Sequence, residues 1–102
     1  MKYQLVLQWP ASAIEDYDSM VEIEDLLIEQ LPSDSHVDGH DAGSGEVNIF
    51  IRTDSPERVF SDVQKILAAR GLLTHARAAF REVAGDEYFV LWPKGLKGFE
   101  VA

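Results

Sequence analysis

The stretch that decides the fold runs from Gly45 to Thr53 and reads Gly-Glu-Val-Asn-Ile-Phe-Ile-Arg-Thr. Its β-branched residues Val47, Ile49 and Ile51 alternate with mixed positions, and this period of two is typical of a strand with one buried face. A glycine-rich turn cluster precedes the stretch, and the Asp-Ser-Pro that follows it is typical of a helix start. The window therefore predicts a hairpin that leads into a helix, with this stretch as the central strand of a sheet.

Hydrophobic periodicity places the remaining elements on both sides of this strand. Ser19 and Glu22 have the spacing of a capping box, and Gly71 suits the residue that follows a helix. We expect strands at residues 2–9, 35–40, 76–81 and 87–92, a turn at 41–45 and a helix at 20–30. We also expect a second helix that is capped by Asp54 or Ser55 and followed by Gly71, and a short strand at 99–101.

This order of elements predicts an α+β fold, namely a ferredoxin-like βαββαβ sandwich with an additional C-terminal β-strand. The sheet would be antiparallel with both helices on one face. Its strand order would be fourth, first, third, second, with the fifth strand paired outside the fourth. The chain has 102 residues, which fits a single domain over residues 1–102 that buries about two thirds of its surface on folding.

Charge is distributed unevenly along the chain. The formal net charge is -9, and between Tyr3 and Ile51 there are eleven Asp or Glu residues and no Lys or Arg. An acidic half attracts basic proteins or cations and disfavours nucleic acid, whose phosphates need basic patches. The alternative is that acidity only keeps the protein soluble. The residues expected to meet a basic protein partner are Glu22, Asp25, Glu29, Asp38, Asp41 and Glu46.

The cysteine count and the first residues bear on the compartment. The chain has no Cys, so it lacks disulfides, thiolate metal sites and a Cys nucleophile, which favours a reducing compartment. The N-terminal apolar run is short and is broken by Gln4 and Gln8, unlike a signal peptide or a membrane span. We therefore expect a cytoplasmic protein with no membrane partner.

His36, Asp38 and His40 recur at every second position, so in a regular strand all three side chains leave the same face. Imidazole and carboxylate groups suit Zn or Ni. The same three residues also suit the solvated face of an edge strand, where polar groups discourage pairing between sheets. The pattern leaves metal binding open between these two interpretations and indicates no other cofactor.

Three further charged residues have alternative interpretations. Glu24 projects into the apolar arc of the expected helix, so its carboxylate either reaches past the rim to water or pairs with an Arg. Arg77 and Arg81 share one face of a strand and either clamp an anion or pair with Asp or Glu. No arrangement of Ser and His predicts a nucleophile, so the pattern leans away from an enzyme without excluding one.

The chain resembles a group of small, acidic, uncharacterised bacterial proteins. The segments that carry the resemblance are Asp38-Gly-His-Asp-Ala-Gly-Ser-Gly-Glu-Val-Asn-Ile-Phe-Ile, Gly85-Asp-Glu-Tyr and Leu91-Trp92-Pro93. The likeness covers most of the chain and implies a bacterial, cytoplasmic, single-domain protein, but no activity. In size and composition alone, the chain is also similar to the immunity proteins that neutralise bacterial toxins.

Two functions are compatible with these observations. The first is a non-enzymatic interaction protein whose acidic half docks a basic protein surface, with toxin immunity as its sharpest form. The second is a dimeric ferredoxin-like small-molecule binder or cofactor-free enzyme, in which helix-free sheet faces pack together around a pocket. An exposed acidic surface over a filled interior would favour the first function, and an apolar-lined cavity with converging polar groups would favour the second.

Overall fold

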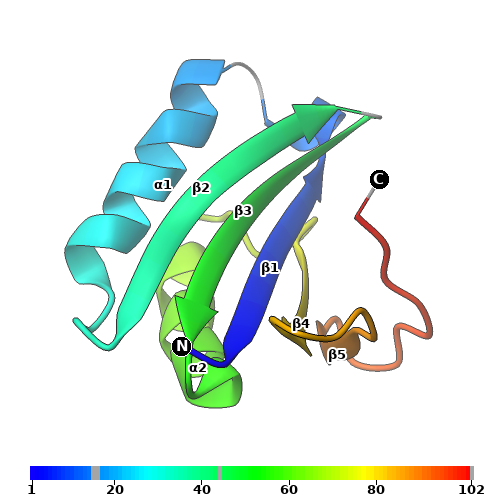
Figure 1. The fold of residues 1–102 in the computed structure, drawn as a ribbon. Coiled ribbons are helices and arrows are strands. Elements are labelled where there is room, and N and C mark those ends of the chain that lie inside the picture. Colours follow the sequence, from blue (N-terminus) through cyan, green and yellow to red (C-terminus); the bar gives the residue numbers. More distant parts are fainter. Residues whose placement is uncertain (15–16, 44, 102) are drawn as a thin grey trace.

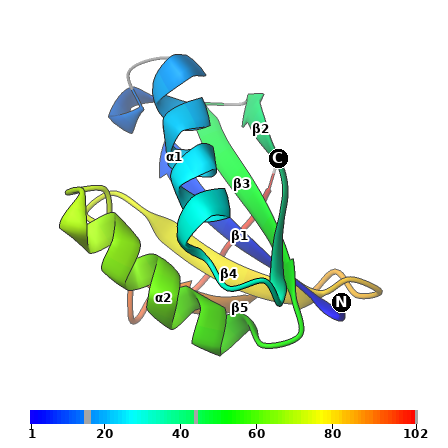
Figure 2. The same ribbon diagram turned by 90° about the vertical axis from the view of Figure 1, so that its left-hand side faces the viewer.

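In the computed structural model, which describes residues 1–14, 17–43 and 45–101, the chain is an α+β protein, as its sequence predicts. Within those ranges an antiparallel sheet of five strands carries two α-helices on one face (Figure 1, Figure 2). The elements are β1 (Tyr3–Pro10), the short 3-10 helix η1 (Ala11–Ala13), α1 (Tyr17–Gln30), β2 (Ser35–Gly43), β3 (Glu46–Thr53), α2 (Pro56–Ala69), β4 (Arg77–Glu82) and β5 (Phe89–Trp92).

The central strand of the sheet is β1, because the strand order is β2-β3-β1-β4-β5. It pairs along its whole length with β3, and from Tyr3 to Gln8 with β4. All residues from Leu5 to Trp9 are buried, so both faces of this strand are covered. The expectation that residues 45–53 form the central strand is therefore wrong, since β3 lies between β1 and β2.

The main core lies between the sheet and the two helices. Leu5 and Leu7 of β1 alternate onto this face beside Ile49 and Ile51 of β3, and all four side chains are fully buried. α2 contributes the apolar face that its helical spacing predicts, and burial of these groups is the main source of stability. The buried residues of α2 are Pro56, Val59, Phe60, Val63 and Leu67.

α2 begins and ends where the sequence predicts. Ser55 is its N-cap residue, although within the described residues its side chain makes no capping hydrogen bond. Asp54 instead accepts a hydrogen bond of 2.8 Å from the backbone N–H of Lys2. Past the C-terminal end, Gly71 has φ +70°, a conformation that a residue with a side chain rarely adopts. This glycine turns the chain away from the helix axis and toward α1.

α1 begins three residues before the expected start. It spans Tyr17–Gln30, so Ser19 lies within its first turn and is not the N-cap of a helix that starts at Met20. The capping-box prediction is therefore wrong. Asp18 in the first turn is favourable because a carboxylate suits the positive end of the helix dipole. Residues 15 and 16, which precede the helix, lie outside the described part of the chain.

Several strand ends also differ from expectation. β2 continues past residue 40 to Gly43, because it pairs with β3 as far as Gly43 opposite Glu46. The expected turn is correspondingly shorter, and its residue 44 lies outside the described residues. β5 starts two residues late, at Phe89, and residues 99–101 do not form the expected short strand.

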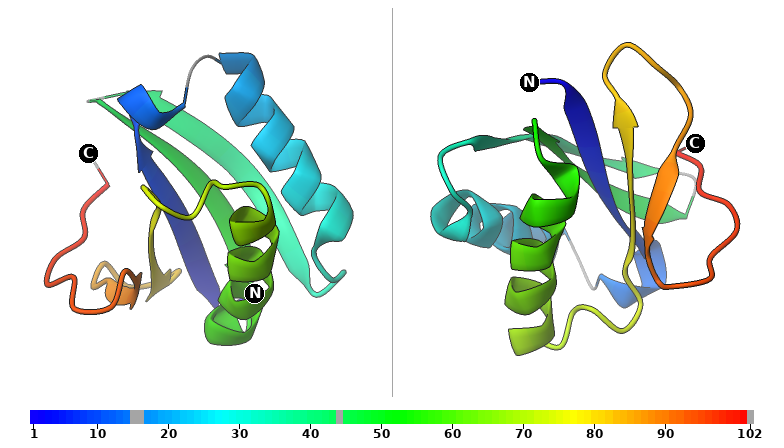
Figure 3. Two further views of the ribbon diagram at one scale, coloured as in Figure 1. Left: turned by 180° about the vertical axis from the view of Figure 1, so that it is seen from behind. Right: turned by 90° about the horizontal axis from the view of Figure 1, so that it is seen from below.

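The C-terminal segment after β5 covers part of the helix-free face of the sheet (Figure 3). Gln8 of β1 donates from Nε2 to Oδ1 of Asn48 on β3 at 3.0 Å and to the carbonyl oxygen of Glu100 at 2.9 Å. Gln8 and Asn48 are each 2% exposed, and the neighbouring pair Val6 and Ala79 is fully buried. Contrary to the interpretation from sequence, this face is therefore not open over β1 and β4.

Candidate functional site

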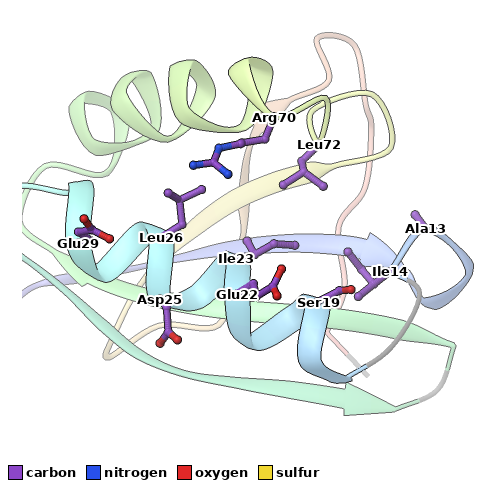
Figure 4. A pocket seen from close by; sticks show the side chains of 10 residues that line it. All are labelled: Ala13, Ile14, Ser19, Glu22, Ile23, Asp25, Leu26, Glu29, Arg70 and Leu72. Atoms are coloured by element: carbon purple, nitrogen blue, oxygen red, sulfur yellow. The ribbon is translucent and has the colours of Figure 1, made fainter.

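A groove of about 610 Å³ lies between α1 and the C-terminal end of α2 (Figure 4). α1 forms one wall, and Arg70 and Leu72, which follow the last residue of α2, form the other. Ala13 of η1 and Ile14, which follows it, close one end. The residues that line the groove are Ala13, Ile14, Ser19, Glu22, Ile23, Asp25, Leu26, Glu29, Arg70 and Leu72.

The floor of the groove is apolar. Ile14 and Ile23 are buried, while Leu26 and Leu72 are half-buried and turn their side chains into the hollow (Figure 4). This floor follows from the sequence of α1, whose apolar arc is wider than the sheet can cover, so that Leu26 remains at the margin. Exposed apolar surface with a polar border is typical of a binding site.

Two carboxylates of α1 border this floor. Glu22 and Glu29 are exposed and lie seven positions apart, which is about 10.5 Å along the helix at 1.5 Å per residue. Asp25 also lines the margin, but its carboxylate points away from the hollow (Figure 4). α1 contains no Lys or Arg that would neutralise these charges. The wall formed by α1 therefore carries a negative potential.

Arg70 brings a positive charge to the opposite wall. It follows the last residue of α2, where a cation suits the negative end of the helix dipole, and its guanidinium extends into the hollow (Figure 4). Within the part of the chain that the structure describes, Arg70 has no ion-pair partner. The groove thus has carboxylates along one wall and an unpaired guanidinium on the other.

Trp9 holds the loop wall in place. Its indole Nε1 donates a hydrogen bond of 2.9 Å to the carbonyl oxygen of Leu72, and the side chain is only 1% exposed. A buried Trp usually finds such a partner for its N–H. The contact ties the central strand to the loop after α2 and keeps Leu72 at the floor of the groove.

The acidic residues expected to meet a partner fall into two separate groups. The three on α1 line the groove. The register of β2 against β3 places the others on the hairpin, on the side of the sheet that carries no helix. Among them, Asp38 already pairs with Arg52, with Oδ2 lying 3.2 Å from Nε. The structure therefore does not join the six into one surface. The hairpin group is Asp38, Asp41 and Glu46.

A β-bulge separates the three candidate metal ligands. The register of β2 shifts at Asp38, before Gly39 with its φ of +136°, and one extra residue in a strand reverses which face the following side chains leave. His36 and Asp38 stay on the helix-free side, with Nε2 and Oδ1 3.8 Å apart. His40 lies opposite the fully buried Ile49 on the core side. The expectation that all three share a face is wrong for His40.

His40 instead meets Glu24 of α1. Its Nδ1 lies 2.9 Å from Oε2 of Glu24, and the two side chains are 25% and 16% exposed. The Glu24 carboxylate is thus partnered by an imidazole from β2, which neither interpretation from sequence anticipated. The contact joins α1 to the edge strand beneath it.

Arg81 has a structural role that the sequence did not indicate. Its Nη1 donates to the backbone carbonyl oxygens of Glu82, Val83 and Gly85 at 3.1, 3.0 and 3.0 Å. The guanidinium therefore organises the turn after β4, where an anion clamp or a carboxylate pair had been expected. Arg77, at the start of the same strand, is exposed.

Sequence reasoning found the acidic wall of the groove and missed the rest of it. Ile14, Arg70 and Leu72 reach the groove through the approach of segments that are distant from α1 in sequence. The available signals were the helix end at Gly71 and the excess width of the apolar arc on α1. Neither signal indicates that these two segments lie side by side.

We expect no tight binding of Zn²⁺ through His36 and His40, because the bulge directs them to opposite sides of the sheet and a zinc site needs converging ligands. Isothermal titration of Zn²⁺ into the unchanged chain and into His36→Ala should give the same weak response. His75→Ala, which removes an exposed imidazole outside β2, is the matched control. A micromolar or tighter dissociation constant that only His36→Ala abolishes would contradict this geometry.

No helix in the described ranges has both the length and the apolar character required to cross a membrane. A comparison of the chain with family models, curated proteins and solved structures finds no match.

Proposed function

We propose that this protein is a non-enzymatic interaction protein that docks a basic partner protein in the groove along α1. The observation that carries the proposal is the groove itself, in which an apolar floor is bordered by carboxylates without a cation on their own helix. Like charges along a helix repel one another, and basic side chains of a partner would relieve that repulsion. Complementary charge also speeds encounter and disfavours wrong partners.

A toxin-neutralising immunity protein of a bacterial cytoplasm is the sharpest version of this proposal. The small size and the acidity of the chain support it, and the absence of Cys suits a reducing compartment. We further assign the domain to the ferredoxin-like class with β5 added. The succession β1, α1, β2, β3, α2, β4 and the antiparallel sheet support that assignment.

A second candidate function is the binding of a small molecule, with or without catalysis. The groove favours it in one respect, since its volume of about 610 Å³ falls in the range of about 300–1,000 Å³ that is typical of ligand pockets. A dimer that encloses a pocket on the helix-free face would have to pack around the C-terminal segment held by Gln8. A partner protein remains the leading proposal because the carboxylates form a row along an open groove.

Reversing two charges on α1, as in Glu22→Lys with Asp25→Lys, should leave the fold intact and slow association with the partner. We expect the association rate at low salt to fall about tenfold or more, and its dependence on salt to weaken, because steering by the acidic row is lost. The partner is first captured on the immobilised chain at low salt, released at high salt and identified. Biolayer interferometry then measures its association rate with each variant at several salt concentrations.

The matched control reverses Asp86 and Glu87 to Lys, which changes the net charge equally at two exposed residues between β4 and β5. This variant should retain most of the association rate. If both double variants behave alike, only the net charge matters and the groove is not the docking surface. If neither variant affects association, the proposed function itself is wrong.

A further inference from the structure

We infer that the occupant of the groove is one amphipathic α-helix of the partner, which carries two cationic side chains seven positions apart and apolar side chains beside them. The inference rests on the proposed function, since it specifies which part of a basic partner enters the groove. It is carried by the juxtaposition of Glu22 and Glu29, the apolar floor between the walls, and Arg70.

The spacing of the carboxylates sets the spacing of the cations. Glu22 and Glu29 are separated by about 10.5 Å along α1, and two residues seven positions apart on a second helix have the same separation. Positions i and i+7 also lie on one face of a helix, next to i+4 and i+8. A helix that lies along α1 can therefore offer both cations to the rim while its apolar side chains contact Leu26 and Leu72.

A helix fits the groove better than an extended segment does. The lining residues belong to η1, to α1, or to the segments that follow η1 and α2, and none belongs to a strand. An extended segment would find no sheet edge to pair with, and its backbone N–H and C=O groups would lie unpaired against an apolar floor. A helix satisfies these groups internally, as in other helix-in-groove complexes.

Because of Arg70, the two walls of the groove carry charges of opposite sign. A cation on the edge of the bound helix that faces Arg70 would be repelled, whereas a carboxylate on that edge would be paired. The bound helix is therefore basic on one edge of its apolar stripe and acidic or neutral on the other. This arrangement selects against helices that are basic on both edges.

The test uses the full chain, isotopically labelled for NMR, and three synthetic peptides of about 20 residues, longer than the about 12–15 residues below which even alanine-rich helices are marginal in water. The first peptide is alanine-based, with Lys at i and i+7, Leu at i+4 and i+8, and Glu at i+5. The second moves the later Lys to i+9, on the opposite face. The third replaces the Glu at i+5 by Lys.

The first peptide should shift the backbone amide signals of residues 22–29 and 70–72 on titration. The second should bind about threefold to fivefold more weakly, the amount expected for the loss of one exposed ion pair. The unchanged chain should prefer the first peptide over the third, and Arg70→Glu should invert that preference. Because Arg70 is exposed, this variant tests charge without opening the core.

Each other outcome overturns the inference. Equal binding of the first and second peptides would mean that the spacing along α1 is not recognised. Shifts confined to the β2–β3 hairpin would place the site elsewhere, and concentration-dependent dimerisation through the groove would make a second copy the occupant. If no peptide binds while Glu22→Lys with Asp25→Lys still slows the captured partner, the groove takes a folded surface, so this inference fails and the proposed function stands.

Discussion

A Phe60→Ala variant is expected to have a free energy of unfolding about 3 to 5 kcal/mol below that of the unchanged chain. Phe60 is 6% exposed and lies in the core between α2 and the sheet, next to the fully buried Val59 and Val63. Removal of the ring forfeits its transfer free energy and leaves a cavity that the surrounding side chains fill only in part. Urea denaturation followed by circular dichroism measures the difference.

The neighbouring substitution Ser61→Ala is the matched control, because Ser61 is exposed on the same turn of α2. It should change the free energy of unfolding by less than about 0.5 kcal/mol. A loss below about 1 kcal/mol for Phe60→Ala would show that this face of α2 does not carry the core.

Replacement of Gln8 by alanine is the second change with a large expected effect, a loss of about 2 to 4 kcal/mol. One Nε2 group serves two acceptors, the Oδ1 of Asn48 and the carbonyl oxygen of Glu100. The buried Oδ1 of Asn48 left without a donor costs about 1 to 3 kcal/mol, and the side chain leaves a cavity as well, whereas the carbonyl oxygen of the exposed Glu100 can turn to water. The C-terminal segment should also loosen, so trypsin should cleave after Lys97 faster than in the unchanged chain.

Gln4→Ala is the control for this change. Gln4 lies four positions earlier on β1, on the same face of the sheet, and is only half-buried. It should cost less than about 1 kcal/mol and leave tryptic cleavage unchanged. If Gln8→Ala lowers stability without faster cleavage, the contact with Glu100 is not what holds the C-terminal segment.

The parts of the fold that could be predicted are those in which a single segment carries the whole signal. The period of two in β3 and the helical spacing from Val59 to Leu67 each specify an element without reference to the rest of the chain. Gly71 likewise marks a helix end, because few other residues adopt a positive φ. The α+β class and the antiparallel sheet follow from these local signals.

The parts that could not be predicted depend on a single inserted residue or on distant partners. The bulge at Asp38 places His36 and His40 on opposite faces of the sheet. In the sequence, only Gly39 indicates this bulge. The pairing of Gln8 with Asn48 depends on distant partners. A polar residue within each of two apolar strands is consistent with either a solvated or a covered face. Only the position of the C-terminal segment decides between them.

Only one wall of the groove could be predicted from the sequence, because the other wall depends on contacts between distant residues. The acidic row on α1 is a local pattern, so Glu22 and Glu29 could be identified from sequence. The opposite wall requires Arg70 and Leu72 to approach α1, and the hydrogen bond from Trp9 to Leu72 that fixes this approach joins residues 63 positions apart. Hydrophobic periodicity is a local signal and does not indicate a contact between residues so far apart in the sequence.

The central place of β1 bears on how the chain folds while it is being synthesised. β1 leaves the ribosome before the other strands of the sheet, yet Gln8 contacts Asn48 and Glu100, which follow 40 and 92 positions later. Until β3 and β4 emerge, both edges of β1 and the side chains of Leu5 and Leu7 stay exposed in the nascent chain. Such a strand can pair with other nascent chains and is a natural target for chaperones that hold apolar segments. Although β1 is made before the other strands of the sheet, it is thus among the last to be enclosed.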